Sequence, residues 1–430
     1  MQRLSSLDPD FARQFDRLVN ARRETDQDVA GSVSNILSKV KSSGDMALVE
    51  YTQRFDDYAL VDDSDWTISS ADCAQAYEAI DAGLRDALDL AAKRIRAYHE
   101  AQLPENRDYT DDDGVRLGAI WRPVDAAGLY VPGGRAAYPS SLLMNAIPAR
   151  VAGVDRLVVT TPTPKGQTNP MVLAAAHIAG IDEIWRVGGA QAVGALAYGT
   201  EKIAAVDVIT GPGNAYVAEA KRQLYGVVGI DMVAGPSEIL VIADGKNDPE
   251  WIAADLLSQA EHDPTSQSIL ITDEAGFAAL VEDCIDLQLA QLATSKTAKT
   301  SWDANGAVII VNDLEAEAPA LANRLAAEHL ELAIDDPEAM LPAIRHAGSI
   351  FLGRMTPEAL GDYVAGPNHV LPTGRRARFS SGLSVLDFMK RTSFIELGQN
   401  AFSAIGPAAA TLAHAEGLPA HAKSVELRIK

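Results

Sequence analysis

Several polar residues in the second half of the sequence have types and spacings that suit metal binding or proton transfer. Gln259 and His262 are three residues apart, so on a helix both side chains project from one face. Asp248 followed by Pro249 favours the start of such a helix, with Asp as the N-cap and Pro in the first turn. An imidazole and an amide oxygen supply half of a zinc site. The same pair is also typical of a polar, solvent-exposed helix end.

Glu328 and His329 are neighbours at the predicted junction between a helix over 319–328 and an apolar strand over 330–334. Parallel-sheet enzymes commonly carry their working groups where strands meet loops and helices. A carboxylate beside an imidazole provides two bases of different strength, which suits a reaction with more than one proton transfer. The alternative is a surface dipeptide at a fraying helix end.

Other ionisable side chains lie in an irregular segment and near the C-terminus. Asp362 and His369 belong to a Gly- and Pro-rich stretch with little expected regular structure, and loops of this kind often carry binding sites. Glu416 and His421 lie among the last residues, where each taken alone is more typical of an ordinary surface.

Glycine-rich turns are expected where strands end and helices begin, at 188–191, at 211–214 and at 129–134. Exposed backbone N–H groups at a helix start attract phosphate, so these turns indicate a nucleotide-binding unit. None of them has the complete G-x-G-x-x-G spacing of a dinucleotide fingerprint. Tyr130, in the third turn, suits either stacking on a flat ring or packing in the core.

The spacing of apolar residues predicts the elements that must position these groups. Helical periodicity dominates up to about residue 102, with a break at Gly44, and short apolar strands alternate with helices from residue 116 onward. Strands are expected at 124–131, 157–161, 183–187, 207–210, 238–243, 268–272, 307–311, 330–334 and 349–352. Helices are expected between them at 141–152, 169–179, 249–262, 274–291 and 319–328.

Alternating strands and helices of these lengths form parallel βαβ units. We therefore predict an α/β fold with two incomplete, Rossmann-like parallel-sheet domains. The expected parts are a mainly helical segment at 1–115, the two sheet domains at 116–235 and 236–378, and a C-terminal tail at 379–430. The tail is too short to form its own core, so we expect it to pack on the body or on a partner subunit.

Composition excludes several classes of partner. The formal net charge of −22 repels phosphate backbones and anionic lipids, so nucleic acid and membrane surfaces are not expected as partners. Cys73 and Cys284 are the only cysteines, which argues against a disulfide framework and a thiolate zinc site. Any metal must then be held by nitrogen and oxygen. The sequence contains no apolar run of about 18 residues, and a cytoplasmic location is expected.

Several long motifs, in one order along nearly the whole chain, resemble the histidinol dehydrogenase family. They are GLYVPGG, VGGAQA, GPGNAYVAEAKR, IDMVAGPSEILVIAD, DLLSQAEH, AAEHLE, GDYVAGPNHVLPT and AEGLPAH. Together they are far more specific than any one pair of residues described above.

The resemblance implies a set of site residues. One Zn²⁺ per subunit would be bound by Gln259, His262, Asp362 and His421, with His421 coming from the other subunit of a homodimer. The same four residues would contact substrate, together with Ser237, His329, His369 and Glu416. Glu328 and His329 would be the catalytic bases, and NAD would be bound by Tyr130, Gln191 and Asn214. The sheet domain at 116–235 would hold NAD, the domain at 236–378 zinc, and the tail would serve dimerisation.

The resemblance also implies a reaction, the four-electron oxidation of L-histidinol to L-histidine through L-histidinaldehyde with two NAD, as the last step of histidine biosynthesis. Relatives of similar sequence oxidise other small polyols such as a sulfopropanediol, although Glu416 would repel a sulfonate. A zinc hydrolase, which needs no nicotinamide, and a non-catalytic zinc-binding protein are alternatives from other classes. The predicted nucleotide-binding unit argues against the hydrolase, and the Glu328–His329 pair argues against the non-catalytic protein.

Overall fold

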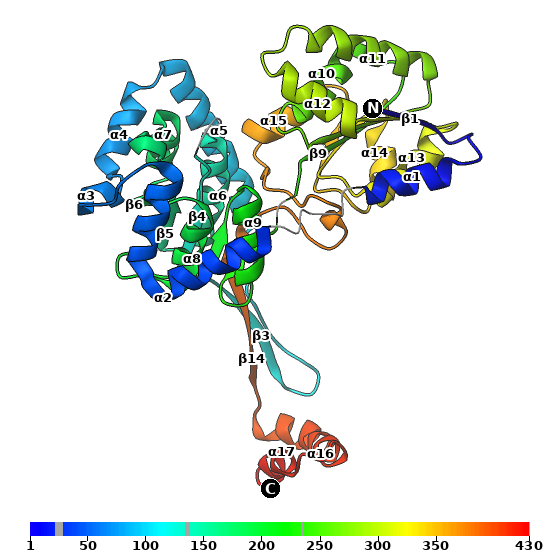
Figure 1. Cartoon of the computed structure of the whole chain (residues 1–430). Helices are drawn as coiled ribbons and strands as arrows, with labels where there is room; N and C mark the ends of the chain where they lie inside the picture. The colour runs from blue at the N-terminus through cyan, green and yellow to red at the C-terminus, as the bar shows by residue number, and fades with distance from the viewer. Residues whose placement is uncertain (22–28, 134–137, 234, 430) are drawn as a thin grey trace.

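The computed structural model describes residues 1–21, 29–133, 138–233 and 235–429. In these residues, two wholly parallel sheets are flanked by helices, and a third, antiparallel sheet extends away from the body (Figure 1). The predicted α/β class with parallel sheets is confirmed. The narrower expectations, a Rossmann-like organisation and the four part boundaries, stay predictions.

The first sheet consists of five short strands between residues 126 and 230. In spatial order they are β6 (Glu183–Trp185), β5 (Arg156–Thr160), β4 (Ala126–Tyr130), β7 (Val208–Thr210) and β8 (Gly229–Ile230). The helices around it are α2 (Val29–Asp56), α3 (Asp63–Trp66), α4 (Ser70–Ala79), α5 (Ala82–Glu100), α6 (Pro139–Ala152), η1 (Pro164–Gly166), α7 (Pro170–Ile178), α8 (Gly189–Tyr198) and α9 (Ala215–Leu224).

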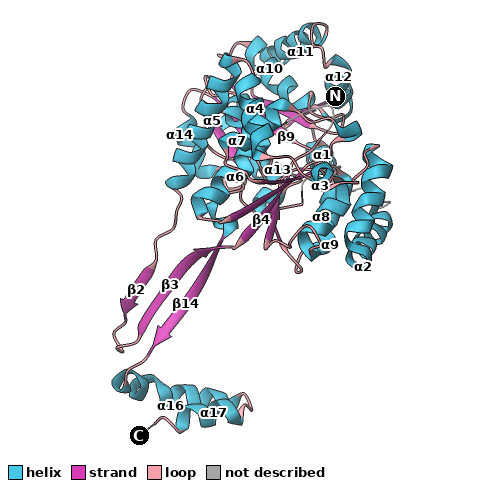
Figure 2. Cartoon of the chain, turned by 90° about the vertical axis from the view of Figure 1, so that its left-hand side faces the viewer, coloured by secondary structure: helices cyan, strands magenta, loops and turns pink. Residues whose placement is uncertain are grey.

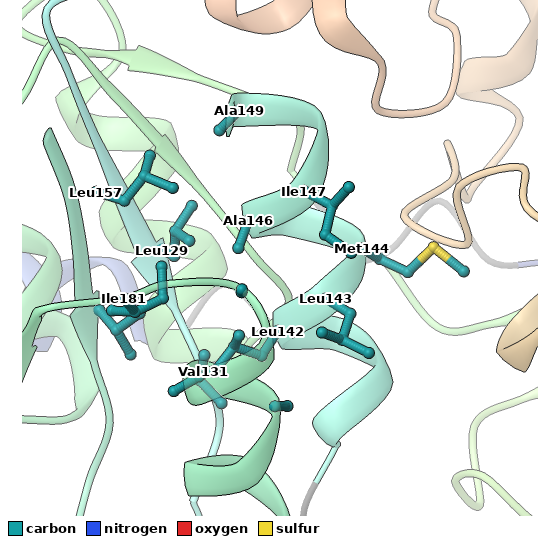
Figure 3. Packing of buried hydrophobic residues seen from close by; sticks show 14 of the residues in the cluster. Leu129, Val131, Leu142, Leu143, Met144, Ala146, Ile147, Ala149, Leu157 and Ile181 are labelled. Carbon is teal, nitrogen blue, oxygen red and sulfur yellow. The ribbon is translucent and has the colours of Figure 1, made fainter. Parts of the chain in front are cut away.

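Alternation along the strands divides the apolar side chains between the two faces of this sheet. Leu129 of β4 packs with α4, α5, α6 and α7, and Figure 3 shows it facing Ala146 of α6. Tyr130, the next residue, packs instead with α2, α8 and α9. Both faces are therefore buried, which explains why these strands read as continuous apolar runs.

The second sheet contains six strands. In spatial order they are β1 (Gln2–Ser5), β11 (Ala307–Ile310), β10 (Gln267–Thr272), β9 (Glu238–Ala243), β12 (His329–Ala333) and β13 (Ser349–Leu352). Its helices are α1 (Phe11–Asn20), α10 (Pro249–Ala260), α11 (Ala275–Leu289), α12 (Ser295–Asn305), α13 (Leu314–Leu325), α14 (Pro337–Met340), η2 (Leu341–Ala343) and α15 (Glu358–Tyr363). The edge strand β1 comes from the N-terminus, so this sheet joins segments that are about 300 residues apart.

The third sheet, which we call the ribbon, is formed by β2 (Arg107–Thr110), β3 (Arg116–Pro123) and β14 (Met389–Glu396). Short η3 (Arg376–Arg378) and η4 (Val385–Phe388) segments precede β14, and α16 (Gln399–Ala415) and α17 (Pro419–Glu426) follow it. The ribbon projects from the body and carries α16 and α17 at its far end (Figures 1 and 2). The two helices pack on each other, and most of their residues are exposed.

The predicted helix over 319–328 was wrong at both ends. Helix α13 begins at Leu314, because the Asp313 side chain accepts a hydrogen bond from the Ala316 N–H and caps the helix. It ends at Leu325, and Pro319 lies inside it. In contrast, Asp248 caps α10 through the Glu250 N–H, with Pro249 in the first turn, as predicted.

None of the described helices has both the length and the apolar composition needed to cross a membrane.

Candidate active site

The predicted Glu328–His329 pair lies where α13 gives way to strand β12, but at the amino end of the strand. His329 is the first residue of β12 and pairs in register with Ile239 of β9. The chain turns into the strand at Ala326, which has φ 48°, a left-handed conformation that is uncommon for a residue with a side chain. The predicted position at a helix-to-strand junction is confirmed, although the helix ends at Leu325, before the pair.

His329 is held as a neutral base with one free ring nitrogen. Its Nδ1 atom lies 3.1 Å from the Glu238 carbonyl oxygen and 3.0 Å from Gln259 Oε1. The carbonyl only accepts, so Nδ1 carries the proton and donates it. Nε2 makes no hydrogen bond among the described residues, and burial lowers the pKa of His329 to about 4.

Glu328 is buried beside this imidazole, with its carboxylate Oε2 3.9 Å from His329 Nδ1. Burial raises the pKa of Glu328 well above its ordinary value, while the hydrogen bond from the Glu238 N–H, at 3.0 Å, acts in the opposite direction. A carboxylate with a raised pKa is a stronger base when it is ionised. Gly348 packs so closely on Glu328 that a Cβ atom there would overlap the Glu328 carbonyl oxygen.

Helix α15 brings two further carboxylates to the free nitrogen. Glu358 and Asp362 are four residues apart and share one helix face. Glu358 Oε1 lies 3.6 Å and Asp362 Oδ1 lies 4.0 Å from His329 Nε2. One ligand atom from each of these three residues lies within 4.8 Å of the other two, as a metal site requires.

Two of these three groups have unused binding capacity in the described structure. Glu358 Oε1 and His329 Nε2 are buried and have no hydrogen-bond partner there. Buried polar atoms are usually paired, so this point suits a bound cation or a transferable proton. Sequence reasoning missed Glu358, although its spacing from Asp362 on a short helix was a usable signal.

Of the predicted pair, Gln259 lies at the end of α10 and contacts His329. Gln259 is fully buried, and its Nε2 atom makes no hydrogen bond among the described residues. His262 follows the end of the helix and is exposed. Its imidazole helps to lower the pKa of Glu358 against the larger effect of burial, which raises it, so His262 lies within electrostatic reach of the cluster. The structure therefore places Gln259 and Asp362 beside His329, whereas His262 has no described contact with the cluster.

His369 borders this cluster and connects it to the first sheet. Its Nδ1 atom lies 2.9 Å from the Asp362 carbonyl oxygen, to which it donates. Nε2 therefore accepts from the Ser141 hydroxyl, 3.2 Å away, at the start of α6. Beside it, the Asn368 amide donates to the Met144 carbonyl oxygen on the same helix. Sequence reasoning did not identify Ser141.

The remaining predicted substrate and metal residues are Ser237, Glu416 and His421. Ser237 is half-buried directly before β9. Glu416 and His421 are exposed, at the end of α16 and in α17, at the far end of the ribbon from α15 (Figure 1). Within one chain, the tail residues do not reach the site.

The predicted cofactor residues gather at the carboxyl ends of the first sheet. The strand order reverses between β4 and β7, which is where open α/β sheets bind ligands. Tyr130 ends β4, Gln191 lies in the first turn of α8, and Asn214 caps α9 by accepting from Tyr216 and Val217 N–H groups. Part of the predicted turn at 129–134, Gly134, lies outside the described residues.

Tyr130 joins two of these loops. Its hydroxyl accepts a hydrogen bond from the Gly189 N–H at 3.0 Å, and burial raises its pKa to about 12. Its ring is packed among core residues of α2, α8 and α9, so packing, the second of the two roles considered for it, is confirmed. Stacking on a ligand stays a prediction.

A cavity of about 440 Å³ opens beside these loops, lined by the segments that follow β4 and β5 and by the start of α7. Pro162 in its wall lies so close to Gly133 and Gly188 that a Cβ atom at either position would overlap it. The cavity is therefore continuous with the loops that carry Tyr130 and Gln191.

Known proteins with similar sequence and structure match this chain over almost all of its length. The family model described as histidinol dehydrogenase matches residues 19–429. Histidinol dehydrogenase from Zymomonas mobilis is 61% identical over 427 residues, covering 99% of both chains, and that from Rhodospirillum rubrum is 60% identical over 427 residues, covering 99% of this chain and 98% of the relative. The chain belongs to the histidinol dehydrogenase family. The crystal structure of histidinol dehydrogenase from Elizabethkingia anophelis superposes with a TM-score of 0.95 at 36% identity and covers 100% of this chain and 98% of that one.

Family membership decides between the classes considered from the sequence. The chain is an oxidoreductase, so the zinc hydrolase and the non-catalytic protein are not supported. The relatives described above all carry the name histidinol dehydrogenase, and the sulfopropanediol alternative is not favoured.

Proposed function

We propose that this chain oxidises L-histidinol to L-histidine through L-histidinaldehyde, with zinc and two molecules of NAD, as the last step of histidine biosynthesis. The observation that carries the proposal is the buried meeting point of His329, Glu358 and Asp362 in a chain that matches the histidinol dehydrogenase family over residues 19–429.

The donor atoms at this point fit a zinc ion. They are nitrogen and oxygen only, which suits zinc. The two buried atoms without partners among the described residues, Glu358 Oε1 and His329 Nε2, are not among the ligands that we propose. We propose that Gln259, His262 and Asp362 bind the ion together with His421 of the partner subunit. The Gln259 carboxamide oxygen has two lone pairs, so it can accept from His329 Nδ1 and still bind a cation. When bound, zinc supplies a Lewis acid that holds and orients the imidazole and amine nitrogens of the substrate.

His329 and Glu328 are proposed to transfer the protons. The free Nε2 of His329 would take the hydroxyl proton of the substrate, and NAD, when bound, would accept the hydride from the carbinol carbon. Glu328 would then take a proton from the water that adds to the aldehyde. His329 would take the hydroxyl proton of the resulting hydrate, and NAD, when bound, would again be the hydride acceptor. The balanced change converts one alcohol, one water and two NAD⁺ to one carboxylate, two NADH and three protons. Both side chains are at most 6% exposed, so bulk water does not compete for these protons.

The loops at the ends of β4 and β7 fit a dinucleotide. Backbone N–H groups at the starts of α8 and α9 that Tyr130 and Asn214 do not already bind suit the pyrophosphate. The adjoining cavity of about 440 Å³ suits the adenosine end. We propose that Tyr130, Gln191 and Asn214 contact NAD from these loops. We propose that Ser237 and His369 contact the substrate.

The exposed tail is proposed to complete the site of a second subunit. Its helices project away from the body of their own chain (Figure 2), which leaves Glu416 and His421 free to reach a neighbour. We propose a homodimer with one zinc per subunit. We place the enzyme in the cytoplasm.

The experiment for this proposal measures NAD reduction with L-histidinol by the purified protein, before and after removal of metal with a chelator. We expect NADH formation that is lost on chelation and restored by zinc. A sulfopropanediol serves as the control substrate and should give no NADH. Turnover of the diol without turnover of histidinol, or full activity after complete metal removal, would contradict the proposal.

A further inference from the structure

A buried ion pair lies beneath the glycine turn between β7 and α9. The Lys221 ammonium, on α9, pairs with the Asp231 carboxylate, which follows β8, and their side chains are only 3% and 1% exposed. Moving both charges out of water costs several kcal/mol, and apolar replacements of similar size are often at least as stable. Stability of the core alone therefore gives little reason for the pair.

The pair binds both backbone groups of one glycine in this turn. Lys221 Nζ donates to the Gly211 carbonyl oxygen at 3.0 Å, and Asp231 Oδ2 accepts from the Gly211 N–H at 2.9 Å. The second carboxylate oxygen accepts from the Met232 N–H at 2.6 Å. These contacts fix the peptide units on both sides of Gly211, so the turn cannot rotate without breaking a buried, charge-assisted hydrogen bond.

On its other side, Gly211 presses against strand β4. It has φ 111°, and a Cβ atom there would overlap the Tyr130 carbonyl oxygen. The turn is thus held between the end of β4 and the ion pair. Tyr130 in turn binds the Gly189 N–H through its hydroxyl, so one network positions the loops that carry all three proposed NAD residues.

We propose that Lys221 and Asp231 are positioning residues for the dinucleotide, acting through Gly211 to hold Asn214 and the N-terminus of α9 in place. This inference rests on the proposed use of NAD. It assigns to the pair a role in cofactor affinity and no direct contact with cofactor or substrate.

The test is steady-state kinetics of Lys221→Met, which removes the donor to Gly211 while keeping the length of the side chain. We expect the KM for NAD to rise about tenfold or more, while the KM for histidinol and the bound zinc stay within about twofold of the wild type. The double variant Lys221→Met/Asp231→Asn removes both charges and should regain stability, but its KM for NAD should stay high because Gly211 still lacks its donor.

Arg222→Met is the matched control, since Arg222 is the next residue on α9 and pairs with Glu219 at the surface. It should leave the KM for NAD unchanged. If Lys221→Met lowers only the melting temperature, or if the double variant regains wild-type affinity for NAD, the pair is merely structural and the inference is wrong. If the wild type itself forms no NADH, the proposed function fails first and the inference falls with it.

Discussion

Replacement of Glu328 by Gln tests the division of labour between the two bases. The change keeps the shape of the side chain, and the amide oxygen can still accept the hydrogen bond that the Glu238 N–H gives at 3.0 Å. Burial already raises the pKa of Glu328 well above its usual range, so a neutral side chain is tolerated here and stability should not fall. What is lost is the proton acceptor for the hydration of the aldehyde.

A positioned general base contributes about 10²- to 10⁴-fold to a rate, which corresponds to roughly 3–5 kcal/mol of activation free energy. Because Glu328 is only 6% exposed, bulk water cannot replace it, and we expect about a 10³-fold loss. The assay is NADH formation from L-histidinaldehyde, with zinc content and the melting temperature measured in parallel. Glu338→Gln, at an exposed position, is the control. Oxidation of the aldehyde by Glu328→Gln at the wild-type rate would refute the reasoning.

Three further predictions follow from the described contacts. Gly211→Ala should destabilise the protein by several kcal/mol in urea unfolding, whereas Gly226→Ala should cost about 1 kcal/mol. Both glycines have positive φ, but only Gly211 lacks space for a Cβ atom. Ser141→Ala should raise the KM for histidinol about tenfold, because His369 Nε2 loses its hydrogen-bond donor. Ser141→Thr keeps a hydroxyl and should restore the KM, and an unchanged KM in Ser141→Ala would exclude a role of Ser141 in positioning His369. The pKa of His329 is lowered from 6.5 to about 4 by burial in the folded protein. As pH falls, His329 is therefore protonated in the unfolded chain before it is protonated in the folded one. About 3 kcal/mol of stability should thus be lost between pH 6.5 and 4 in the metal-free protein, and His329→Gln should lack that loss.

The sequence predicted most of the parallel strands because burial on both faces makes them continuous apolar runs. It missed β1 and β8, which are short and lack such a run. Strand β9 (Glu238–Ala243) was predicted with the same bounds that the structure has. The start of α10 followed from a local signal, since Asp248 and Pro249 suit the first turn of a helix. The start of α13 was misplaced at Pro319, which lies inside the helix, because the cap that Asp313 provides was not recognised.

The composition of the site was harder to predict, because it depends on contacts between elements that are distant in sequence. Glu358 reaches His329 only because α15 packs beside the start of β12. Ser141 reaches His369 across 228 residues of chain. The extended ribbon was also missed, since β3 pairs along its length with β14, which lies in a tail that showed no strand pattern of its own.

The central claim is a four-electron oxidation at one buried site, and the stoichiometry of NADH formation tests it most directly. With limiting L-histidinol and excess NAD, the reaction is followed to completion by the absorbance of reduced nicotinamide. The account predicts close to two NADH for each histidinol consumed, with histidine as the product. One NADH per histidinol, with the aldehyde accumulating in solution, would contradict it.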